Sequence, residues 1–205
     1  MNMIIHYANY VDSSRVLGPY DRAVLWVYGC CFDCDGCIAK SYKSGTYNTD
    51  TVDEMVKWFL STGKTHLTIS GGEPFLQAEA LALFIKLIRQ SVDVGVIVYS
   101  GFTFDELSEK SMNNEGVKAL LELADILIDG RYVKALDDGR PYIGSSNQRI
   151  ILISDRYADD IEDYYNIQEG RKVELKLDSE KTLLIGVPSA EQRSLWKNLK
   201  QFADE

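Results

Sequence analysis

The four cysteines of this 205-residue chain all lie in the short segment YGCCFDCDGC, at residues 28–37. Thiols so close in sequence cannot staple distant segments as the disulfides of small secreted proteins do, so metal ligation is the better interpretation. Two registers are possible. Cys31, Cys34 and Cys37 give CxxCxxC, whereas Cys30, Cys34 and Cys37 give CxxxCxxC, and either set presents three thiolates to one inorganic centre.

A fourth protein ligand for such a centre is not evident. Zinc and iron–sulfur sites with four protein ligands need one more side chain, but no cysteine follows Cys37 and the two histidines, His6 and His66, are isolated. A lone histidine is more often a packed or surface residue than a ligand. We therefore expect a cluster with three protein ligands and one open metal position, which is typical of a site that does chemistry.

The cysteine segment follows a predicted strand. The apolar run at 23–28 is rich in aromatic and β-branched residues and is typical of a strand buried on both faces. Further strands are predicted at 66–70, 94–100, 124–129 and 149–154, with helices between them at 51–63, around 81–88, at 103–107 and at 117–124. This alternation predicts a parallel sheet of right-handed βαβ units, whose ligands gather beyond the C-terminal strand ends. That edge would carry CCFDCDGC, GGEP, YSGF and DG.

The GGEP segment at 71–74 has features of a ligand-binding turn. Gly71 and Gly72 leave the backbone clear for a ligand to approach closely. Glu73 adds a carboxylate suited to a cationic amine, and Pro74 stiffens the turn and suits the first positions of a following helix. Paired glycines after a strand are more often a simple turn, so it is the position opposite the cysteine segment that favours binding.

Composition limits the other function classes. With 45% hydrophobic and 26% charged residues, the chain can bury the core of a single domain. Its formal net charge of -9 at pH 7 argues against a nucleic-acid partner. No apolar run approaches the roughly 20 residues of a membrane span, and the N-terminus lacks a basic region followed by an apolar one. We expect a soluble cytoplasmic protein with no membrane partner.

The combination of CxxxCxxC after one strand with GGEP after the next resembles the signature of the radical S-adenosylmethionine (radical SAM) enzymes. Further segments between about residues 15 and 151 are similar, in order, to the activating proteins of anaerobic ribonucleotide reductase and their single-cluster relatives. These segments are RVLGPYDRAVLWVYGCCFDCDGC, SGGEPFLQ, YSGFTFDEL, ILIDGRYV and GSSNQRII.

The resemblance implies a role for individual residues. Cys30, Cys34 and Cys37 match the family's three ligands to a [4Fe–4S] cluster, which selects the CxxxCxxC register and leaves Cys31 spare, with packing as its expected use. SAM would chelate the unique iron through its methionine amine and carboxylate. The residues that the resemblance places around SAM are Gly71, Gly72, Glu73, Pro74, Tyr99, Ser100, Gly101, Asp129 and Asn147.

The alternating elements and the resemblance together predict an α/β fold, a partial (β/α)6 TIM-like barrel of mainly parallel strands. The radical SAM core would span 1–154, and a C-terminal extension at 155–205 would pack on it to form one compact domain. Two strands at 171–177 and 181–187, and a helix at 189–202 capped by Ser189 and Gln192, are expected in the extension. We expect the extension to close the open barrel edge. A docking or substrate-selecting element is the alternative, and 156–166 could cover the site or a partner.

The implied reaction is reductive cleavage of SAM at the cluster to methionine and a 5′-deoxyadenosyl radical. No side chain needs to act as an acid or base, so no catalytic residue is expected beyond the cluster and SAM. The radical would pass to a glycine of a large glycyl radical enzyme, such as anaerobic ribonucleotide reductase, with flavodoxin or ferredoxin as the electron donor. An incompletely ligated cluster also implies sensitivity to oxygen.

Two other functions stay open at the level of sequence. The chain could be a radical SAM catalyst that acts on a peptide or a small molecule, because one scaffold hosts many targets. It could also be a non-catalytic iron–sulfur or zinc protein, although GGEP and the other strand-end segments would then lack a purpose.

Overall fold

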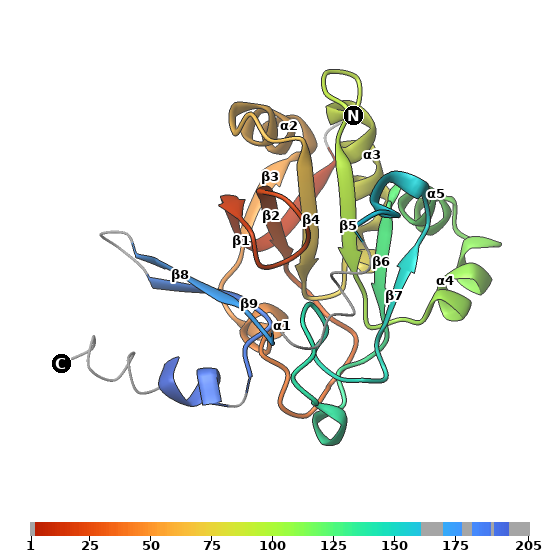
Figure 1. The fold of residues 1–205 in the computed structure, drawn as a ribbon. Coiled ribbons are helices and arrows are strands. Elements are labelled where there is room, and N and C mark those ends of the chain that lie inside the picture. The colour runs from red at the N-terminus through yellow and green to blue at the C-terminus, as the bar shows by residue number, and fades with distance from the viewer. Residues whose placement is uncertain (1–2, 161–169, 178–181, 190, 197–205) are drawn as a thin grey trace.

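A computed structural model describes residues 3–160, 170–177, 182–189 and 191–196. In this part of the chain the main sheet has seven strands (Figure 1). Their spatial order is β3 (Asn48–Thr51), β1 (Ile4–Ser14), β2 (Arg22–Val27), β4 (His66–Gly71), β5 (Gly95–Tyr99), β6 (Ile126–Asp129) and β7 (Arg149–Leu152). Neighbours from β2 to β6 run parallel, and their C-terminal ends lie at the lower edge of the sheet in Figure 1. The predicted α/β class with mainly parallel strands, consistent with a partial TIM barrel, is confirmed.

Helices cover one face of this sheet. They are α2 (Val52–Ser61), α3 (Ala78–Ile88), α4 (Phe104–Ser111) and α5 (Glu115–Leu123). The predicted start of α2 is confirmed, because Thr51 and Glu54 form a capping box that satisfies backbone N–H groups of the first turn. The helices and alternate strand residues share one buried apolar cluster, which includes Leu25, Ile69, Val98 and Leu127 from the strands. The period of two along each strand leaves the remaining strand side chains for the opposite face.

In the described part of the chain, that opposite face is covered by loops and by the C-terminal extension. Two smaller buried clusters lie there: one holds Ile97, Ile126, Ile128, Ile143, Ile150 and Tyr157, and the other holds Val16, Leu17, Val24, Trp26 and Ile185. The helix-covered face therefore supplies the main core, while the loop-covered face leaves room for a site.

The expected strand at 149–154 is present as β7, but it pairs with β6 in the antiparallel sense. The expectation of a fifth parallel strand was therefore wrong. A parallel return requires a crossover connection of a dozen or more residues, usually with a helix. The described connection 130–148 contains only the short 3₁₀ helix η2 (Lys134–Leu136). Without a crossover helix, the chain turns back beside the strand it has just left.

The sequence did not predict β1 and β3, which pair antiparallel with each other at one edge of the sheet. Strand β3 has the sequence NTDT, with no apolar residue, so it is extended only because β1 offers a partner. The other short elements are α1 (Ser41–Ser44), η1 (Pro74–Gln77) and η3 (Asp155–Tyr157).

The predicted hairpin of the extension is present as β8 (Val173–Leu177) and β9 (Thr182–Gly186). It forms a sheet of its own, so among the described residues it does not close the barrel edge by strand pairing. It packs instead on the loop-covered face, where Ile185 is completely buried in the cluster of Trp26.

The helix after the hairpin begins as predicted. Ser189 N–H donates to Oε1 of Gln192 at 2.8 Å, and Gln192 N–H donates to Oγ of Ser189 at 3.2 Å. The predicted helix positions 197–202 lie outside the described residues. From sequence, the segment 156–166 could cover the site or a partner. Its described part begins near the N-terminal ends of the strands, away from the cysteines, where the Tyr157 hydroxyl contacts His66 and Arg22. Residues 161–166 lie outside the described residues.

Candidate cluster and cofactor site

Backbone contacts hold the cysteine loop against the GGEP segment. Glu73 N–H donates to the carbonyl of Gly29 at 2.7 Å, and Gly72 N–H donates to the carbonyl of Val27 at 2.8 Å. A Cβ at Gly72 would lie 2.0 Å from the Gly29 oxygen, and a Cβ at Gly71 would lie 2.6 Å from the Val27 nitrogen and oxygen. The two glycines therefore allow the ends of β2 and β4 to approach each other. This close approach requires glycine at both positions, in addition to the ligand contact predicted from sequence.

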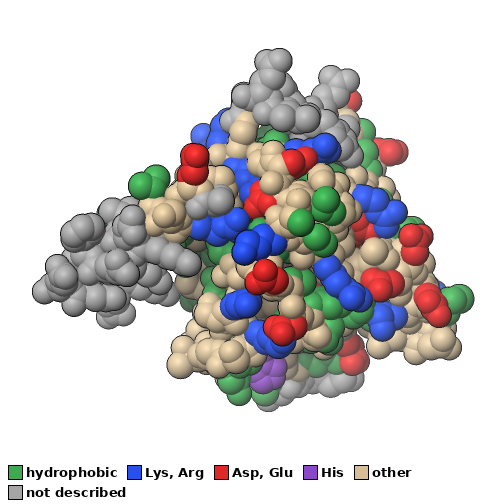
Figure 2. All heavy atoms as spheres, turned by 90° about the horizontal axis from the view of Figure 1, so that it is seen from below, with side chains coloured by type: hydrophobic (Ala, Val, Ile, Leu, Met, Phe, Trp, Pro, Cys, Tyr) green, Lys and Arg blue, Asp and Glu red, His purple; other side chains and the backbone are tan. Residues whose placement is uncertain are grey.

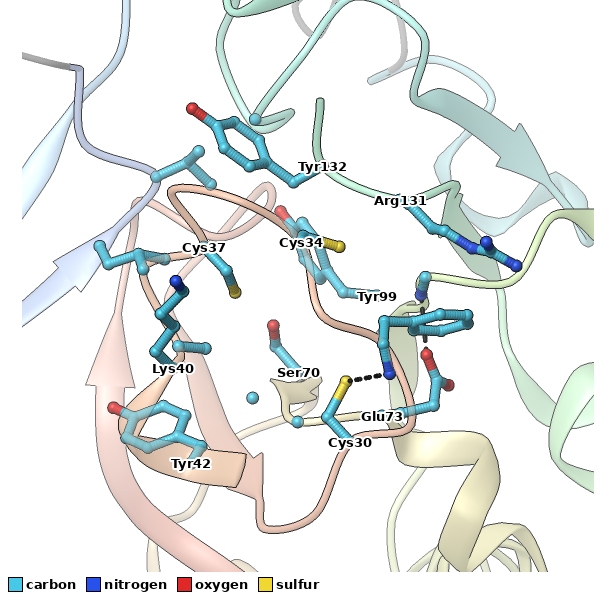
Figure 3. Close-up of a pocket in the computed structure, with 18 of the residues that line it drawn as sticks. Cys30, Cys34, Cys37, Lys40, Tyr42, Ser70, Glu73, Tyr99, Arg131 and Tyr132 are labelled. Atoms are coloured by element: carbon cyan, nitrogen blue, oxygen red, sulfur yellow. Dashed lines mark hydrogen bonds between the residues drawn. The ribbon is translucent and has the colours of Figure 1, made fainter. Parts of the chain in front are cut away.

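Three of the four cysteines turn toward one cavity. The sulfurs of Cys30, Cys34 and Cys37 point into a common space in Figure 3, and all three residues line the cavity. Cys31 is exposed and is not among the lining residues, so it does not serve the packing role expected from sequence. Phe32 N–H donates to Sγ of Cys30 at 3.4 Å. This arrangement favours the CxxxCxxC register.

Burial affects the thiols before any metal binds. It raises the pKa of Cys30 and of Cys37 above the ordinary thiol value, and it is the largest cause at both positions. Within the described ranges, no three Cys, His, Asp or Glu side chains are close enough to hold a single metal ion. A [4Fe–4S] cluster does not need that arrangement, because each thiolate binds a different iron. The three inward thiols fit such a cluster.

The cavity has a volume of about 220 Å³. Of the residues predicted to surround SAM, Gly71, Gly72, Glu73, Tyr99, Ser100 and Gly101 line it. Pro74, Asp129 and Asn147 are not lining residues. The structure thus brings together the segments that follow β2, β4 and β5, as the parallel arrangement requires.

Glu73 is completely buried beneath this cavity. Its Oε1 accepts hydrogen bonds from Phe75 N–H at 3.0 Å and from the Ser100 hydroxyl at 2.9 Å, and its Oε2 accepts one from Gly101 N–H at 2.8 Å. Burial raises the pKa of Glu73 to about 7, against the lowering effect of these three donors. The carboxylate therefore ties the end of β4 to the loop after β5.

Asp129 and Asn147, which were predicted to contact SAM but do not line the cavity, form hydrogen bonds to the segments around it. Asp129 is buried and accepts hydrogen bonds from Phe104 N–H at 2.7 Å and from Nη2 of Arg149 at 2.5 Å. Asn147 donates from Nδ2 to the carbonyl of Arg131 at 2.9 Å. Asn147 therefore holds the loop that follows β6, whereas Asp129 ties the end of β6 to the start of α4 and to β7.

The floor of the cavity is a row of side chains on neighbouring strands. Trp26 is the register partner of Ser70, and Tyr99 comes one position after Val98, the partner of Ile69. All three floor residues line the cavity. The Tyr99 hydroxyl is buried and has no hydrogen-bond partner among the described residues, and its burial raises the pKa of this phenol above its usual value. The floor is therefore largely aromatic, and the Tyr99 hydroxyl within it is shielded from solvent.

Several lining residues were not predicted from sequence. They are Trp26, Ser70, Lys40, Tyr42, Arg131, Tyr132, Gln148 and, from the extension, Arg171, Leu184, Gly186, Val187, Pro188 and Arg193. The alternation along β2 and β4 could have pointed to Trp26 and Ser70, because both precede a strand end that carries a motif. No local signal marks the residues of the extension.

Charged side chains of both signs surround the mouth, although the chain carries a net charge of -9. Figure 2 views the molecule from the site end of the sheet and shows Lys and Arg side chains gathered near its centre, interspersed with Asp and Glu. Lys43 pairs with Asp33 at 3.3 Å and Arg131 with Glu106 at 3.4 Å. Such exposed pairs contribute little stability each, about 0–1 kcal/mol.

Residues 16–151 match the family described as the 4Fe-4S single cluster domain. The chain belongs to this family. It is 29% identical over 154 residues to the anaerobic ribonucleoside-triphosphate reductase-activating protein of Salmonella typhimurium. This alignment covers 70% of this chain and 96% of that protein. The protein of the same name from Vibrio cholerae is 30% identical over 156 residues, covering 71% and 97%. That of enterobacteria phage T4 is 27% identical over 157 residues, covering 71% and 93%.

Membership identifies the chain as a radical SAM enzyme of the glycyl-radical activating type, with a [4Fe–4S] cluster and SAM as its cofactors. The three thiols that face the cavity fit the cluster, and the GGE segment beside them follows the next parallel strand. In the described ranges no helix is long and apolar enough to cross a membrane.

Proposed function

We propose that this enzyme generates a glycyl radical on a large partner, which is anaerobic ribonucleotide reductase or a similar glycyl radical enzyme. The observation that carries the proposal is the convergence of Cys30, Cys34, Cys37 and the GGE segment on one cavity at neighbouring parallel strand ends. The names of relatives that align over nearly their whole length support the choice of partner. An electron-transfer protein such as flavodoxin or ferredoxin would supply the electron, and the reaction would take place in the cytoplasm.

When bound, the cluster and SAM would supply one-electron cleavage of the sulfonium and a radical able to abstract hydrogen. The chain would hold the cluster through Cys30, Cys34 and Cys37. Contacts to SAM would come from the residues that line the cavity: Gly71, Gly72, Glu73, Tyr99, Ser100 and Gly101. Pro74, Asp129 and Asn147 would act through the backbone that they fix.

The aromatic floor has its own part in this function. A reactive radical must be kept from water and close to its target. Trp26 is 8% exposed, and the hydroxyl of Tyr99 is shielded from solvent. No lining side chain is needed as an acid or base, since hydrogen-atom abstraction requires no separate proton transfer.

The test is anaerobic reconstitution with iron and sulfide, followed by reduction and addition of SAM. The proposal expects 5′-deoxyadenosine, and a glycyl radical signal by electron paramagnetic resonance when a candidate glycyl radical enzyme is added. A partner with its radical-bearing glycine replaced by alanine should give no signal. If 5′-deoxyadenosine forms but no candidate glycyl radical enzyme acquires a radical, a peptide or small-molecule substrate would be favoured. Preparations that hold zinc and leave SAM intact would refute the cleavage chemistry.

A further inference from the structure

Part of the cavity wall comes from outside the segment that matches the family. The matched residues are 16–151, whereas the lining residues Arg171, Leu184, Gly186, Val187, Pro188 and Arg193 belong to the extension. The relatives from Salmonella typhimurium and Vibrio cholerae align over 96% and 97% of their own length but over only 70% and 71% of this chain. The extension is therefore an addition to the part that those relatives share.

A single carboxylate joins the extension to the loop after β6. Asp137 Oδ1 lies 2.8 Å from Nη1 of Arg171, and its Oδ2 lies 3.0 Å from Nη2 of Arg193. The side chain of Arg171 is only 2% exposed and that of Asp137 13% exposed. Charge-assisted hydrogen bonds with this degree of burial are strong and fixed in geometry. Asp137 thus acts as a bridge between two segments that are distant in sequence.

Arg171 also binds the backbone of the same loop. Its Nε donates to the carbonyl of Arg140 at 3.0 Å and its Nη2 donates to the carbonyl of Gly144 at 2.8 Å. Most donors of this guanidinium therefore bind the loop 137–144, while Nη1 also donates to the carbonyl of Pro188 in the extension at 3.4 Å, so Arg171 fixes the extension against that loop. Breaking one partner of a buried charged pair leaves the other charge uncompensated, which is costly.

The hairpin of the extension reaches the other side of the cavity. Ile185 is completely buried with Trp26 and Val24 of β2, and Tyr42 of α1 packs against the same cluster. The extension passes on the Cys37 and Lys40 side of the cavity in Figure 3. It therefore spans from the cysteine loop and α1 to the loop after β6.

We infer that the extension is a selectivity wall, held in place by Asp137, that admits to the cluster only a slender, extended segment of a partner polypeptide. The identity of that segment as the glycine-bearing part of a glycyl radical enzyme rests on the proposed function. The wall itself follows from the contacts described here. Asp137 is a positioning residue, since it acts through Arg171 and Arg193 rather than on a cofactor.

Access through the wall can be measured with thiol reagents of two sizes. The full-length chain is alkylated without oxygen before cluster assembly, either with N-ethylmaleimide or with a maleimide attached to a bulky polyethylene glycol. Peptide mass spectrometry then gives the rate at each cysteine. Cys31, which is exposed and outside the cavity, is the internal reference. The ratio of bulky to small reagent at one cysteine cancels differences in thiol reactivity.

In the wild-type chain we expect this ratio to be at least tenfold lower at Cys37 than at Cys31. Asp137→Asn should raise the ratio at Cys37 about tenfold and leave Cys31 unchanged. Asp138→Asn is the matched control, because Asp138 is the next residue and pairs with Arg140 of its own loop at 2.7 Å. If Asp137→Asn fails to fold, Arg193→Gln removes the more exposed of the two pairs and the 3.4 Å contacts of Arg193 to the Tyr132 hydroxyl, keeps the buried Arg171–Asp137 pair, and should raise the ratio in the same direction.

Equal ratios at Cys37 and Cys31 in the wild-type chain would overturn the inference. The inference would also be overturned if the ratio at Cys37 were the same in folded Asp137→Asn and folded Asp138→Asn proteins. Neither measurement uses SAM or a cluster, so its outcome is independent of whether the chain activates a glycyl radical enzyme.

Discussion

The hydroxyl of Ser100 donates a 2.9 Å hydrogen bond to Oε1 of Glu73, and this contact joins the ends of β4 and β5 beneath the cavity. Gly101 N–H adds a 2.8 Å hydrogen bond to the other carboxylate oxygen. One fully buried carboxylate therefore fixes the relative position of two strand ends that line the cofactor site. Glu73 is therefore expected to contribute to the stability of the fold as well as to the geometry of the cofactor site.

We expect Glu73→Gln to lower the free energy of unfolding by about 2–3 kcal/mol, because its amide NH₂ would face a backbone N–H and leave buried donors without an acceptor. Urea unfolding of the cofactor-free protein measures the change. Glu106→Gln is the control. Glu106 accepts from Thr103 N–H in the capping box of α4, and glutamine serves that role as well. Equal losses in the two variants would contradict the assigned role of Glu73.

The raised pKa of Glu73 predicts a pH dependence of stability. Burial raises this pKa from 4.5 to about 7 in the folded state. Between these values the folded state keeps a proton that the unfolded state has lost. The stabilising contribution is complete below pH 4.5 and is lost as the pH rises through 7, with a loss of about 3 kcal/mol at most. Urea unfolding from pH 5 to 8 should show this slope in the wild-type protein and not in Glu73→Gln, and parallel slopes would refute it.

The sequence predicts the central strands and their ends because buried parallel strands leave long apolar runs. The run before Cys30 and the run before Gly71 both end where the structure places the cavity. The edge strand β3 has no apolar residue, so its pairing with β1 could not be inferred locally. The antiparallel sense of β7 depends on the missing crossover helix, which the periodicity of the strand itself does not reveal.

The site was predictable where a motif marks a strand end and not where distant segments meet. The thiols and the GGE segment are local patterns. The bridge of Asp137 to Arg171 and Arg193 joins residues with no common pattern, and only the folded chain brings them together. The role of Gly72 in the approach of Gly29 is likewise a tertiary contact, although the residue itself had been singled out.

The orientation of the cysteines predicts which of them hold the cluster. Cys30→Ala, Cys34→Ala and Cys37→Ala should each lose the cluster and SAM cleavage, because each removes a thiol that faces the cavity. Cys31→Ala should keep both, since Cys31 is exposed and does not line the cavity. Iron and sulfide content after anaerobic reconstitution measures the outcome. Retention of the cluster in Cys30→Ala with loss in Cys31→Ala would show that the CxxCxxC register is used.

The buried hydroxyl of Tyr99 predicts an unusual stability effect. Tyr99→Phe removes a buried oxygen that has no hydrogen bond among the described residues, so the cofactor-free protein should keep its stability or gain up to about 1 kcal/mol. Tyr157→Phe is the matched control on the same face of the sheet. Its hydroxyl contacts Nδ1 of His66 at 2.7 Å and Nη2 of Arg22 at 3.2 Å. That variant should lose about 1–2 kcal/mol, and a comparable loss in Tyr99→Phe would mean that its hydroxyl has a partner.

The burial of Ile185 predicts that the extension and the core unfold together. Ile185 is completely buried against Val16, Leu17, Val24 and Trp26, so Ile185→Ala should cost about 2–4 kcal/mol in urea unfolding. Leu177→Ala is the control, because Leu177 of the same hairpin is 76% exposed and its truncation should change stability by less than about 0.5 kcal/mol. The proposed single domain, with a core at 1–154 and an extension at 155–205, further requires that tryptophan fluorescence and far-ultraviolet circular dichroism report one coincident transition. Two separate transitions, with Ile185→Ala shifting only one of them, would instead show that the extension is an independent unit laid against the core.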